Sequence, residues 1–245
     1  MTAFVNTNFE VLVDAVDLAG FASTATLSAQ YDEIDITTLA SGNWRQKMQG
    51  LGSHTWTVEG FQSLTGVDPS FPGTSIGLNT ITIAPVNGGA TIGDPAYLGQ
   101  ARTISRTPLS GAVGDVAGFS LNWAGTGQLA RGQILHPLAA RTSTGNGTVT
   151  TFTTPAANQF LCASFHVVAV SGTGSITFTV ATDDAVGFAS PTTRITSTAM
   201  TAIGGQFVAV PGPFAGETHV RPSWTIAGFT SVTFVVAAGL SSIPA

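Results

Sequence analysis

The chain has 245 residues, enough for two domains of ordinary size that each bury a core of their own. Only 9% of the residues are charged and the mean hydropathy is +0.33, yet no stretch of about 18 consecutive apolar residues exists, so a helical membrane span is excluded. The net charge is −5 and the few basic residues form no patch, so direct nucleic-acid binding is not expected.

The start of the chain, MTAFVNTNFEVLV, has no basic residues before its apolar run and no small-residue cleavage site, so we expect no signal peptide. Further on, apolar and polar residues alternate, and no window of about eleven residues has helical periodicity. Trp56 and Val58, and later Leu121 and Trp123, each indicate a strand with one buried and one polar face. The predicted fold class is all-β.

A longer strand is predicted from Thr24 to Thr38, and its apolar phase changes partway along. A β-bulge near Asp32 and Glu33 restores the register. The alternative is a turn at this point, which makes a hairpin of two short strands.

The next segment, Leu39 to Gly52, is predicted to be a loop because glycines punctuate it. It nevertheless carries Trp44, Met48 and Leu51. Two interpretations stay open: these side chains fold back onto their own core, or they enter a neighbouring subunit, since aromatic residues, Met and Arg are enriched at interfaces.

A change of composition between Leu135 and Thr148 indicates an interdomain linker. The predicted division is a domain at residues 1–140, a linker at 141–148 and a domain at 149–245. Short strands with Gly and Pro turns favour a sandwich of immunoglobulin-like or jelly-roll type for the second domain. They are expected at residues 160–170, 175–181, 207–210, 219–226 and 232–237.

No motif in the chain carries a convincing chemistry. Residues 73–77 match G-x-S-x-G, but a strand-like segment follows where a nucleophile elbow needs a helix. Residues 125–130 match G-x-G-x-x-A, and they are interpreted as a turn because residues 131–137 are unsuited to the helix that a dinucleotide site needs. No catalytic, cofactor-binding or metal-binding residue is therefore assigned.

The isolated titratable residues have plain structural interpretations. Cys162 lies in an apolar run and is expected to be a small buried core residue. His166, beside apolar residues, is expected to be a hydrogen-bonded core or rim residue and no ligand. Asp183 and Asp184 precede Gly187 and are expected to form a solvated turn, with weak calcium binding as the alternative.

The first half of the chain resembles the tail tube proteins of siphophages, the long-tailed bacteriophages with non-contractile tails. The resemblance covers roughly residues 5–132 and rests on three segments in the family's order: TATLSAQYDEIDITTLASGNWRQKMQGL, HTWTVEGFQ and RTPLSGAVGDVAGFSLNWAGTGQL. The segment HVRPSWTIAGFTSVTFVVAAG resembles the sandwich domain that many phage tail proteins carry on the outside. One departure is SLTGVDPSFPGTSIG, which prolines interrupt where the family has a helix.

The resemblance implies a tail-tube-type β-barrel or sandwich half and a homo-oligomer. Hexameric rings would join their sheets edge to edge and stack into a tube, together with other tail proteins, and DNA would pass through without specific binding. The location implied is the virion tail, after synthesis in a bacterial host cytoplasm. No cofactor is implied.

The family's loop between its second and third strands reaches the adjacent ring. On this chain that implies an inter-ring or inter-subunit contact by Leu39, Trp44, Arg45, Lys47, Met48 and Leu51. The acidic lumen of family tubes, which repels DNA phosphates, implies the candidates Asp32, Glu33, Asp35 and Glu59.

Two other functions remain open. The first is another virion part, such as a head-decoration, tail terminator or distal tail protein. The second is a carbohydrate-binding adhesin that uses aromatic residues such as Trp224. Trp224 shares its strand phase with Val220 and Ile226, so burial in the core is favoured. An enzyme is the least expected class.

Overall fold

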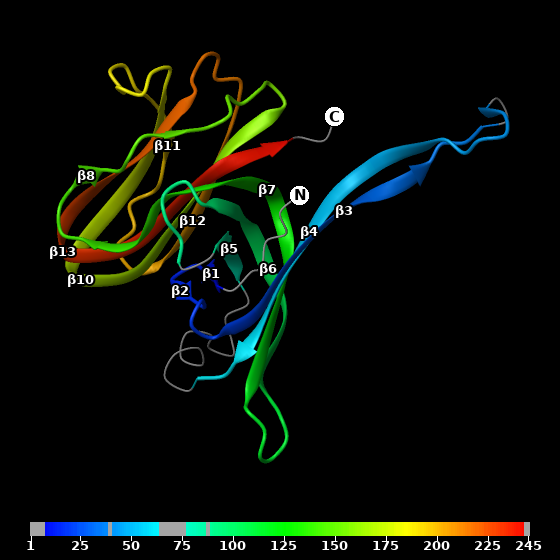
Figure 1. Cartoon of the computed structure of the whole chain (residues 1–245), viewed down its shortest axis with the longest axis horizontal. Coiled ribbons are helices and arrows are strands. Elements are labelled where there is room, and N and C mark those ends of the chain that lie inside the picture. The colour runs from blue at the N-terminus through cyan, green and yellow to red at the C-terminus, as the bar shows by residue number, and fades with distance from the viewer. Residues whose placement is uncertain (1–7, 39–40, 64–76, 87–88, 243–245) are drawn as a thin grey trace.

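The structure is a computed structural model, and it describes residues 8–38, 41–63, 77–86 and 89–242. Strands are the regular elements of these residues, which confirms the all-β fold class (Figure 1). In chain order they are β1 (Asn8–Val13), β2 (Val16–Asp17), β3 (Ala22–Asp35), β4 (Lys47–Phe61), β5 (Leu78–Val86), β6 (Pro95–Ser110), β7 (Gly118–Arg141), β8 (Gly145–Asn146), β9 (Thr150–Thr151), β10 (Gln159–Asp183), β11 (Thr192–Thr196), β12 (Gly204–Pro211) and β13 (His219–Ser242).

Strand β7 joins the two halves of the molecule. Its first part pairs with β4 over residues 118–124, and its last part pairs with β13 over residues 131–141. On its other side β7 pairs with β6 along most of its length. A single hydrogen-bonded path therefore runs from β11 through β10, β13, β7, β6, β5 and β1 to β2.

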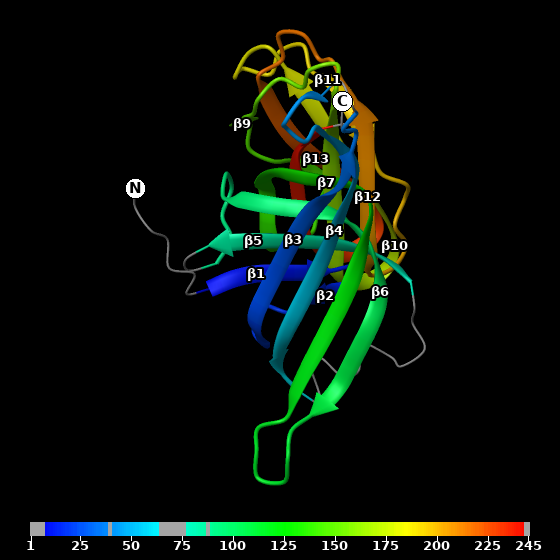
Figure 2. The same cartoon turned by 90° about the vertical axis from the view of Figure 1, so that its right-hand side faces the viewer.

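The first half is built around an antiparallel sheet in the order β3, β4, β7 and β6, whose strands run side by side in Figure 2. The alternation seen in the sequence places Trp56, Val58, Leu121 and Trp123 on the inner face, where all four are buried. Strands β1 and β5 close the core on the other side. The two predicted strands that carry these residues are thus confirmed.

Strand β3 is continuous through the predicted bulge. Its register against β4 shifts between Tyr31 and Glu33, where Gly50 and Leu51 of β4 lie opposite Asp32. The predicted irregularity is confirmed, and the alternative of a turn at this point is wrong.

The second half is dominated by the long strands β10 and β13, which pair antiparallel over most of their length. Each of these two strands contains two of the strands predicted from the sequence. Between the predicted strands the register shifts, at residues 171–175 of β10 and 227–231 of β13, but the pairing continues on both sides of the shift. An aromatic cluster made of Phe165, Phe178, Trp224 and Phe234 forms the centre of this core; Phe165 stacks on Phe178, and the other two ring contacts are edge-on or tilted.

A buried polar junction connects the halves at His166 of β10. The ring Nδ1 donates to the carbonyl oxygen of Asp14 at 2.8 Å, so Nε2 accepts from the Thr82 hydroxyl, also at 2.8 Å. The Thr82 hydroxyl in turn lies 2.8 Å from the hydroxyl of Ser164. Complete burial lowers the pKa of His166 to about 4. The prediction of a hydrogen-bonded core histidine is confirmed.

The segment expected to link two domains is part of the sheet. Leu135 and His136 are buried within β7, and Gly145 and Asn146 pair with β13. His136 is stacked on Phe234, at a centroid distance of 4.4 Å. The linker therefore cannot begin at Leu135, and the division at residues 141–148 stays a prediction.

Candidate assembly surfaces

A long two-stranded ribbon projects from the first half (Figures 1 and 2). The pairing of β4 with β7 ends at Thr55, which lies opposite Ala124. The ribbon consists of β3 and β4 beyond that pair and of the connection between the two strands. We call residues 29–38 and 41–54 the arm. A two-stranded ribbon has no core of its own and is marginally stable in isolation. The arm is therefore held by its continuity with β3 and β4 of the sheet and by no core of its own.

Large apolar side chains on the arm lie in solvent. Trp44 is 82% exposed and Leu51 is 81% exposed, and Tyr31, Ile34 and Met48 are exposed as well. The interpretation that Trp44, Met48 and Leu51 fold back onto their own core is wrong. Apolar residues gathered on one projection are typical of a protein–protein contact.

The predicted loop is shorter than expected, because Lys47 to Gly52 belong to β4. The glycines in this segment mark close cross-strand contacts. A Cβ on Gly50 would lie 2.9 Å from the Cβ of Asp32, and one on Gly52 would lie 2.8 Å from the Tyr31 ring. Glycine is needed at residue 50, where Asp32 already fills the space, whereas the exposed Tyr31 ring beside Gly52 is free to shift.

The residues predicted for the inter-subunit contact divide into three groups. Leu39 lies outside the described residues, whereas Trp44 and Arg45 lie on the exposed connection. Met48 and Leu51 are on β4 and point into solvent. Lys47 also lies on β4, and its ammonium group forms an ion pair with Glu33 on the opposite strand.

The four acids proposed to line a lumen do not lie together. Asp32, Glu33 and Asp35 are on the arm, and Glu59 is on the exposed face of the four-stranded sheet. Hydrogen bonds from the Thr37 hydroxyl and backbone lower the pKa of Asp35. Of the four candidates, the structure thus places one on the sheet surface and three on the projection.

The exposed face of this sheet is rich in hydroxyl and amide groups. One row across it consists of Thr26, Thr57, Asn122 and Ser105. The Thr57 hydroxyl donates to the Asn122 amide oxygen at 2.8 Å, and the Asn122 amide nitrogen donates to the Ser105 hydroxyl at 3.0 Å. These bonds hold the side chains in one layer, so the face is polar without depending on charge.

In the part of the chain that the structure describes, no further strand pairs with either outer edge of the sheet, at β3 or at β6 beyond Arg102. Within the described part of the chain, β3 pairs only with β4, and β6 beyond Arg102 pairs only with β7. Open edges present unpaired backbone N–H and C=O groups that invite pairing with another chain. Because β3 and β6 lie at opposite edges of an antiparallel four-stranded sheet, β3 of one copy can continue into β6 of the next in antiparallel order.

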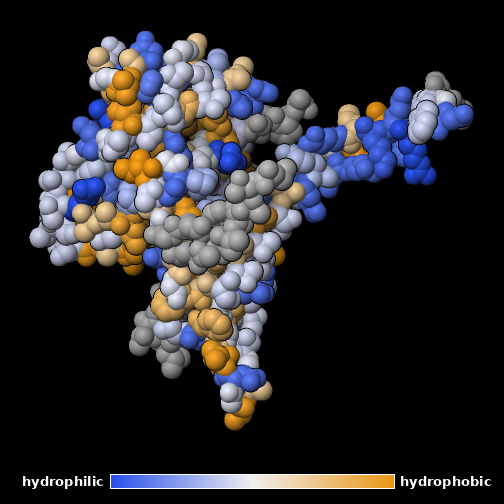
Figure 3. Space-filling view, in the orientation of Figure 1, coloured by the Kyte–Doolittle hydropathy of each residue, from blue (hydrophilic) through white to orange (hydrophobic). Residues whose placement is uncertain are grey.

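A second projection, the end of the β6–β7 hairpin, points away from the arm (Figure 1). Its apolar side chains are exposed: Leu109 by 67%, Val113 fully and Val116 by 73%. Figure 3 shows apolar residues along this projection down to its end. The sequence analysis missed it, although Gly111 and Gly114 beside Asp115, flanked by apolar residues, are a readable turn signal.

A hollow of about 480 Å³ lies where the arm leaves the body. Tyr31 and Leu51 of the arm form one wall, and Leu129 and Arg131 of β7 lie in the other. His54 lines the hollow, and its Nε2 is buried and has no hydrogen-bond partner. Burial lowers the pKa of His54. A hydrogen bond with the backbone of Gln100 raises it, but by less.

The glycine motif at residues 125–130 is explained by this histidine. A Cβ on Gly125 would lie 2.1 Å from His54 Nε2, so the ring needs glycine beneath it. Gly127 has a φ of +77° at a register shift, where β7 has extra residues opposite Gly99 and Gln100 of β6. The predicted turn is wrong, because the motif is a bulge inside β7, and strand continues where a nucleotide site needs a helix.

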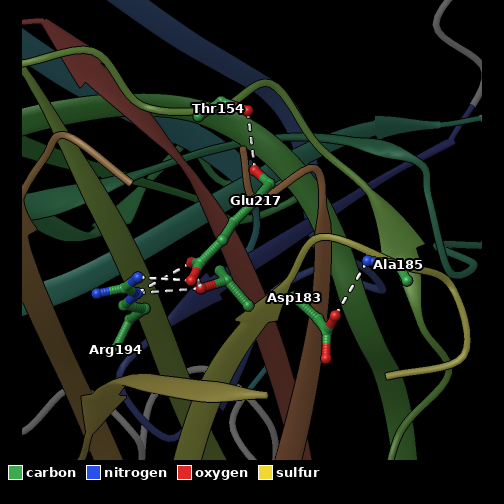
Figure 4. Close-up of polar contacts among 6 residues, drawn as sticks. Thr154, Asp183, Ala185, Arg194 and Glu217 are labelled. Carbon is green, nitrogen blue, oxygen red and sulfur yellow. Dashed lines mark hydrogen bonds and ion pairs between the residues drawn. The ribbon is translucent and has the colours of Figure 1, made fainter. Parts of the chain in front are cut away.

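The polar cluster of the second half is structural (Figure 4). The Arg194 guanidinium donates to both carboxylate oxygens of Glu217, at 3.1 and 2.7 Å, and stacks on the Phe214 ring. Burial alone would raise the pKa of Glu217, but hydrogen bonds from Arg194 and Thr182 hold it below its usual range. Arg194 and Glu217 are thus already paired with each other.

Burial tests three of the residue predictions for the second half, those for Trp224, Cys162 and Asp183. Trp224 is 5% exposed and donates its indole N–H to the Ser143 carbonyl, so it offers no stacking surface to a glycan. Cys162 is buried and free, as expected, and burial raises its pKa to about 12. Asp183 accepts hydrogen bonds from the backbone of Ala185 and Ser190, so a turn follows it as predicted, but Asp183 is itself only 2% exposed and only Asp184 is solvated.

Two kinds of site are not seen in the residues that the structure describes. These residues contain no group of three potential metal ligands. They also form no helix that could cross a membrane.

Comparison with known proteins gives only distant structural likenesses. No family model and no curated protein matches the sequence. The chain is similar to one in the tail of an empty gene transfer agent particle of C6 symmetry, with TM-score 0.37, 19% identity, and 49% of this chain and 93% of that chain covered. It is also similar to one in a native gene transfer agent virion, with TM-score 0.39, 16% identity, and coverage of 53% and 98%.

A third likeness is to the Dit protein (gp 19.1) of SPP1, named as a hub adsorption apparatus of phages that infect Gram-positive hosts. Here the TM-score is 0.36, the identity is 10%, and 95% of this chain and 98% of that chain are covered. All three TM-scores lie below 0.5. The function therefore has to be argued from this chain's own residues and geometry.

Proposed function

We propose that the chain is a structural subunit of a bacteriophage tail tube, without enzymatic activity. The observation that carries this proposal is the four-stranded sheet β3–β4–β7–β6, whose outer edges, at β3 and at β6 beyond Arg102, pair with no further strand among the described residues. Pairing the β3 edge of one copy with the β6 edge of the next is a heterologous contact, which closes into a ring when the rotation permits. Ring closure satisfies both edges of every copy.

The two faces of the sheet suit this arrangement. The inner face carries Trp56 and Trp123 and is covered by β1 and β5, so it faces the body of the same subunit. The other face, with its Thr57–Asn122–Ser105 row, is polar and uncovered, and it would line the conduit. A layer of hydroxyl and amide groups lets DNA pass without offering a cluster of cations to its phosphates.

The arm supplies the contact between rings in this proposal. Trp44 and Leu51 are too apolar and too exposed to remain in solvent, and they extend beyond the last β4–β7 pair. Stacking of rings would bury them against the neighbouring ring. The second half, with β10 and β13 at its centre, would lie outside the tube, and the location would be the virion tail.

Electron microscopy of the purified protein tests the proposal. A tail tube subunit is expected to give rings and long tubes, whereas another virion part, such as a terminator or distal tail protein, gives rings that do not extend. A chain that stays monomeric at high concentration and low salt would overturn the proposal.

Cysteine cross-linking tests the edge contact separately. One new cysteine is placed on β3, at Thr24, Thr26 or Ser28, and one on β6, at Ser105 or Thr107. Cys162 is buried and does not interfere. For the cysteine pair that matches the true register of β3 against β6, oxidised assemblies should give a ladder of cross-linked species that ends at the hexamer. The control pair, Thr26→Cys with Val186→Cys in the second half, should give no cross-linked species.

A further inference from the structure

The end of the β6–β7 hairpin and the hollow at the base of the arm have complementary surfaces. We call residues 109–117 the plug and the hollow the socket. The plug exposes Leu109, Val113 and Val116, and the socket presents Tyr31 and Leu51. The hollow has a volume of about 480 Å³, which is room for apolar side chains of a hairpin tip but not for the whole plug.

The charges are complementary as well. Asp115 is the charged residue of the plug, and it lies at the turn between Gly114 and Val116. Arg131 is the charged residue among those that line the socket in the described part of the chain. It lies on β7 between Tyr97 and Leu240, and it is exposed. An acid on the plug and a base in the socket fix the orientation of a contact more than its strength.

The positions of the two surfaces determine which molecule can join them. The β6–β7 hairpin ends at one end of the four-stranded sheet, and the arm leaves the sheet toward the other end (Figures 1 and 2). The residues that line the socket include those at the base of the arm. A subunit cannot place its own plug in its own socket. A second copy displaced along the strands can, and this contact leaves a free plug at one end and a free socket at the other, so it propagates.

We propose that the plug of each subunit enters the socket of a second copy in the adjacent ring, with Asp115 paired to Arg131. This inference rests on the proposed tube and adds a second contact between rings, at the base of the arm. Leu51 takes part in both contacts, whereas Tyr31 and Arg131 belong to the socket alone. Covering the socket also removes the His54 side of the hollow from solvent. The tube would then be held by two contacts per subunit, one at the arm tip and one at the arm base.

Charge reversal provides the test, since both residues are exposed and outside the core. The variants are Asp115→Arg, Arg131→Asp and the double reversal, with Asp184→Arg on an exposed turn of the second half as a matched control. The readouts are ring formation and ring stacking, measured by electron microscopy and by sedimentation over a concentration series.

Each single reversal is expected to leave rings intact and to raise the concentration needed for stacking by about tenfold or more. The double reversal should restore stacking to nearly the wild-type concentration, and Asp184→Arg should stack normally. Single variants that stack like the wild type, or a double variant that does not recover, would overturn the inference while leaving the tube intact. Absence of rings in the wild type would instead overturn the proposed function itself.

A cysteine pair guards against loss of folding in the charge variants. Val113→Cys with Leu51→Cys should form disulfides between subunits in stacked tubes and none in isolated rings. Val113→Cys with Val186→Cys, both exposed, should not cross-link in either. Cross-linking of the first pair in unstacked rings would place the plug within one ring and refute the inter-ring contact.

Discussion

Replacing Gly125 by alanine tests whether His54 requires glycine beneath it. The added Cβ would lie 2.1 Å from His54 Nε2 and 2.2 Å from Cδ2, far inside contact distance. The ring has little freedom to move, because it is buried and packs edge-on against Trp56 at 5.9 Å. Overpacking of this kind costs about 1–3 kcal/mol of unfolding free energy.

The reasoning predicts a specific coupling with His54. In a His54→Ala background the space beneath residue 125 is free, so Gly125→Ala should become neutral or stabilise by about 0.4–1 kcal/mol through the unfolded chain. The coupling energy of the pair is therefore expected to be about 2 kcal/mol. Gly187, where a Cβ would meet nothing within 4 Å, provides the control substitution.

Urea unfolding followed by tryptophan fluorescence measures these free energies, at a concentration at which the chain is unassembled. Gly187→Ala is expected to change stability by less than about 0.5 kcal/mol. If Gly125→Ala has the same effect with and without His54, the steric explanation of this glycine is refuted.

Two further predictions concern pH. Burial, with a smaller effect of Asp17, raises the pKa of Glu10 to about 7, so its stabilising contribution is complete below the unfolded value of 4.5 and is lost as pH rises through 7. The free energy of unfolding of Glu10→Gln should therefore exceed that of the wild type by about 1–2 kcal/mol at pH 8 and equal it at pH 4; a gain at both pH values contradicts this. Burial lowers the pKa values of His136 and His166 to about 4. The stability that these neutral histidines contribute is therefore present above pH 6.5 and is lost as pH falls toward 4. His166→Gln should be less stable than the wild type at pH 7. Between pH 6.5 and 4 its free energy of unfolding should fall about half as steeply with pH as that of the wild type; an unchanged slope would show that His166 does not titrate in this range.

Local alternation was sufficient to predict several of the strands and part of the core. Trp56, Val58, Leu121 and Trp123 repeat with a period of two, and the pattern alone places them on one buried face. The register shift beside Asp32 was readable for the same reason, since a change of apolar phase within a strand requires an irregularity.

The errors arose where a residue's environment comes from a distant part of the chain. Gly50, Gly52 and Gly125 were interpreted as loop or turn residues, but each lies in a strand beneath a side chain of another strand. His136 follows a similar rule: its stacking partner Phe234 lies on β13, far away in sequence. Glycine is ambiguous in a single sequence, because a turn and a close strand contact both require it.

The candidate site was only partly predictable. Exposed Trp44, Met48 and Leu51 were recognised as apolar residues out of place, which requires only their chemical type and the surrounding glycines. The open β6 edge, the plug and the socket depend on which strands pair and where the pairing ends. Pairing of this kind is decided by the whole sheet, and no local pattern reports it.

Cryo-electron microscopy of the assembled protein tests the central claim most directly. The account predicts that β3 of each subunit is hydrogen-bonded in antiparallel order to residues 103–107 of β6 in the next subunit, so that the sheets form one closed barrel with the Thr57–Asn122–Ser105 row facing its interior. An assembly in which the β3 edge remains in solvent, or in which this polar row faces outward, would contradict it.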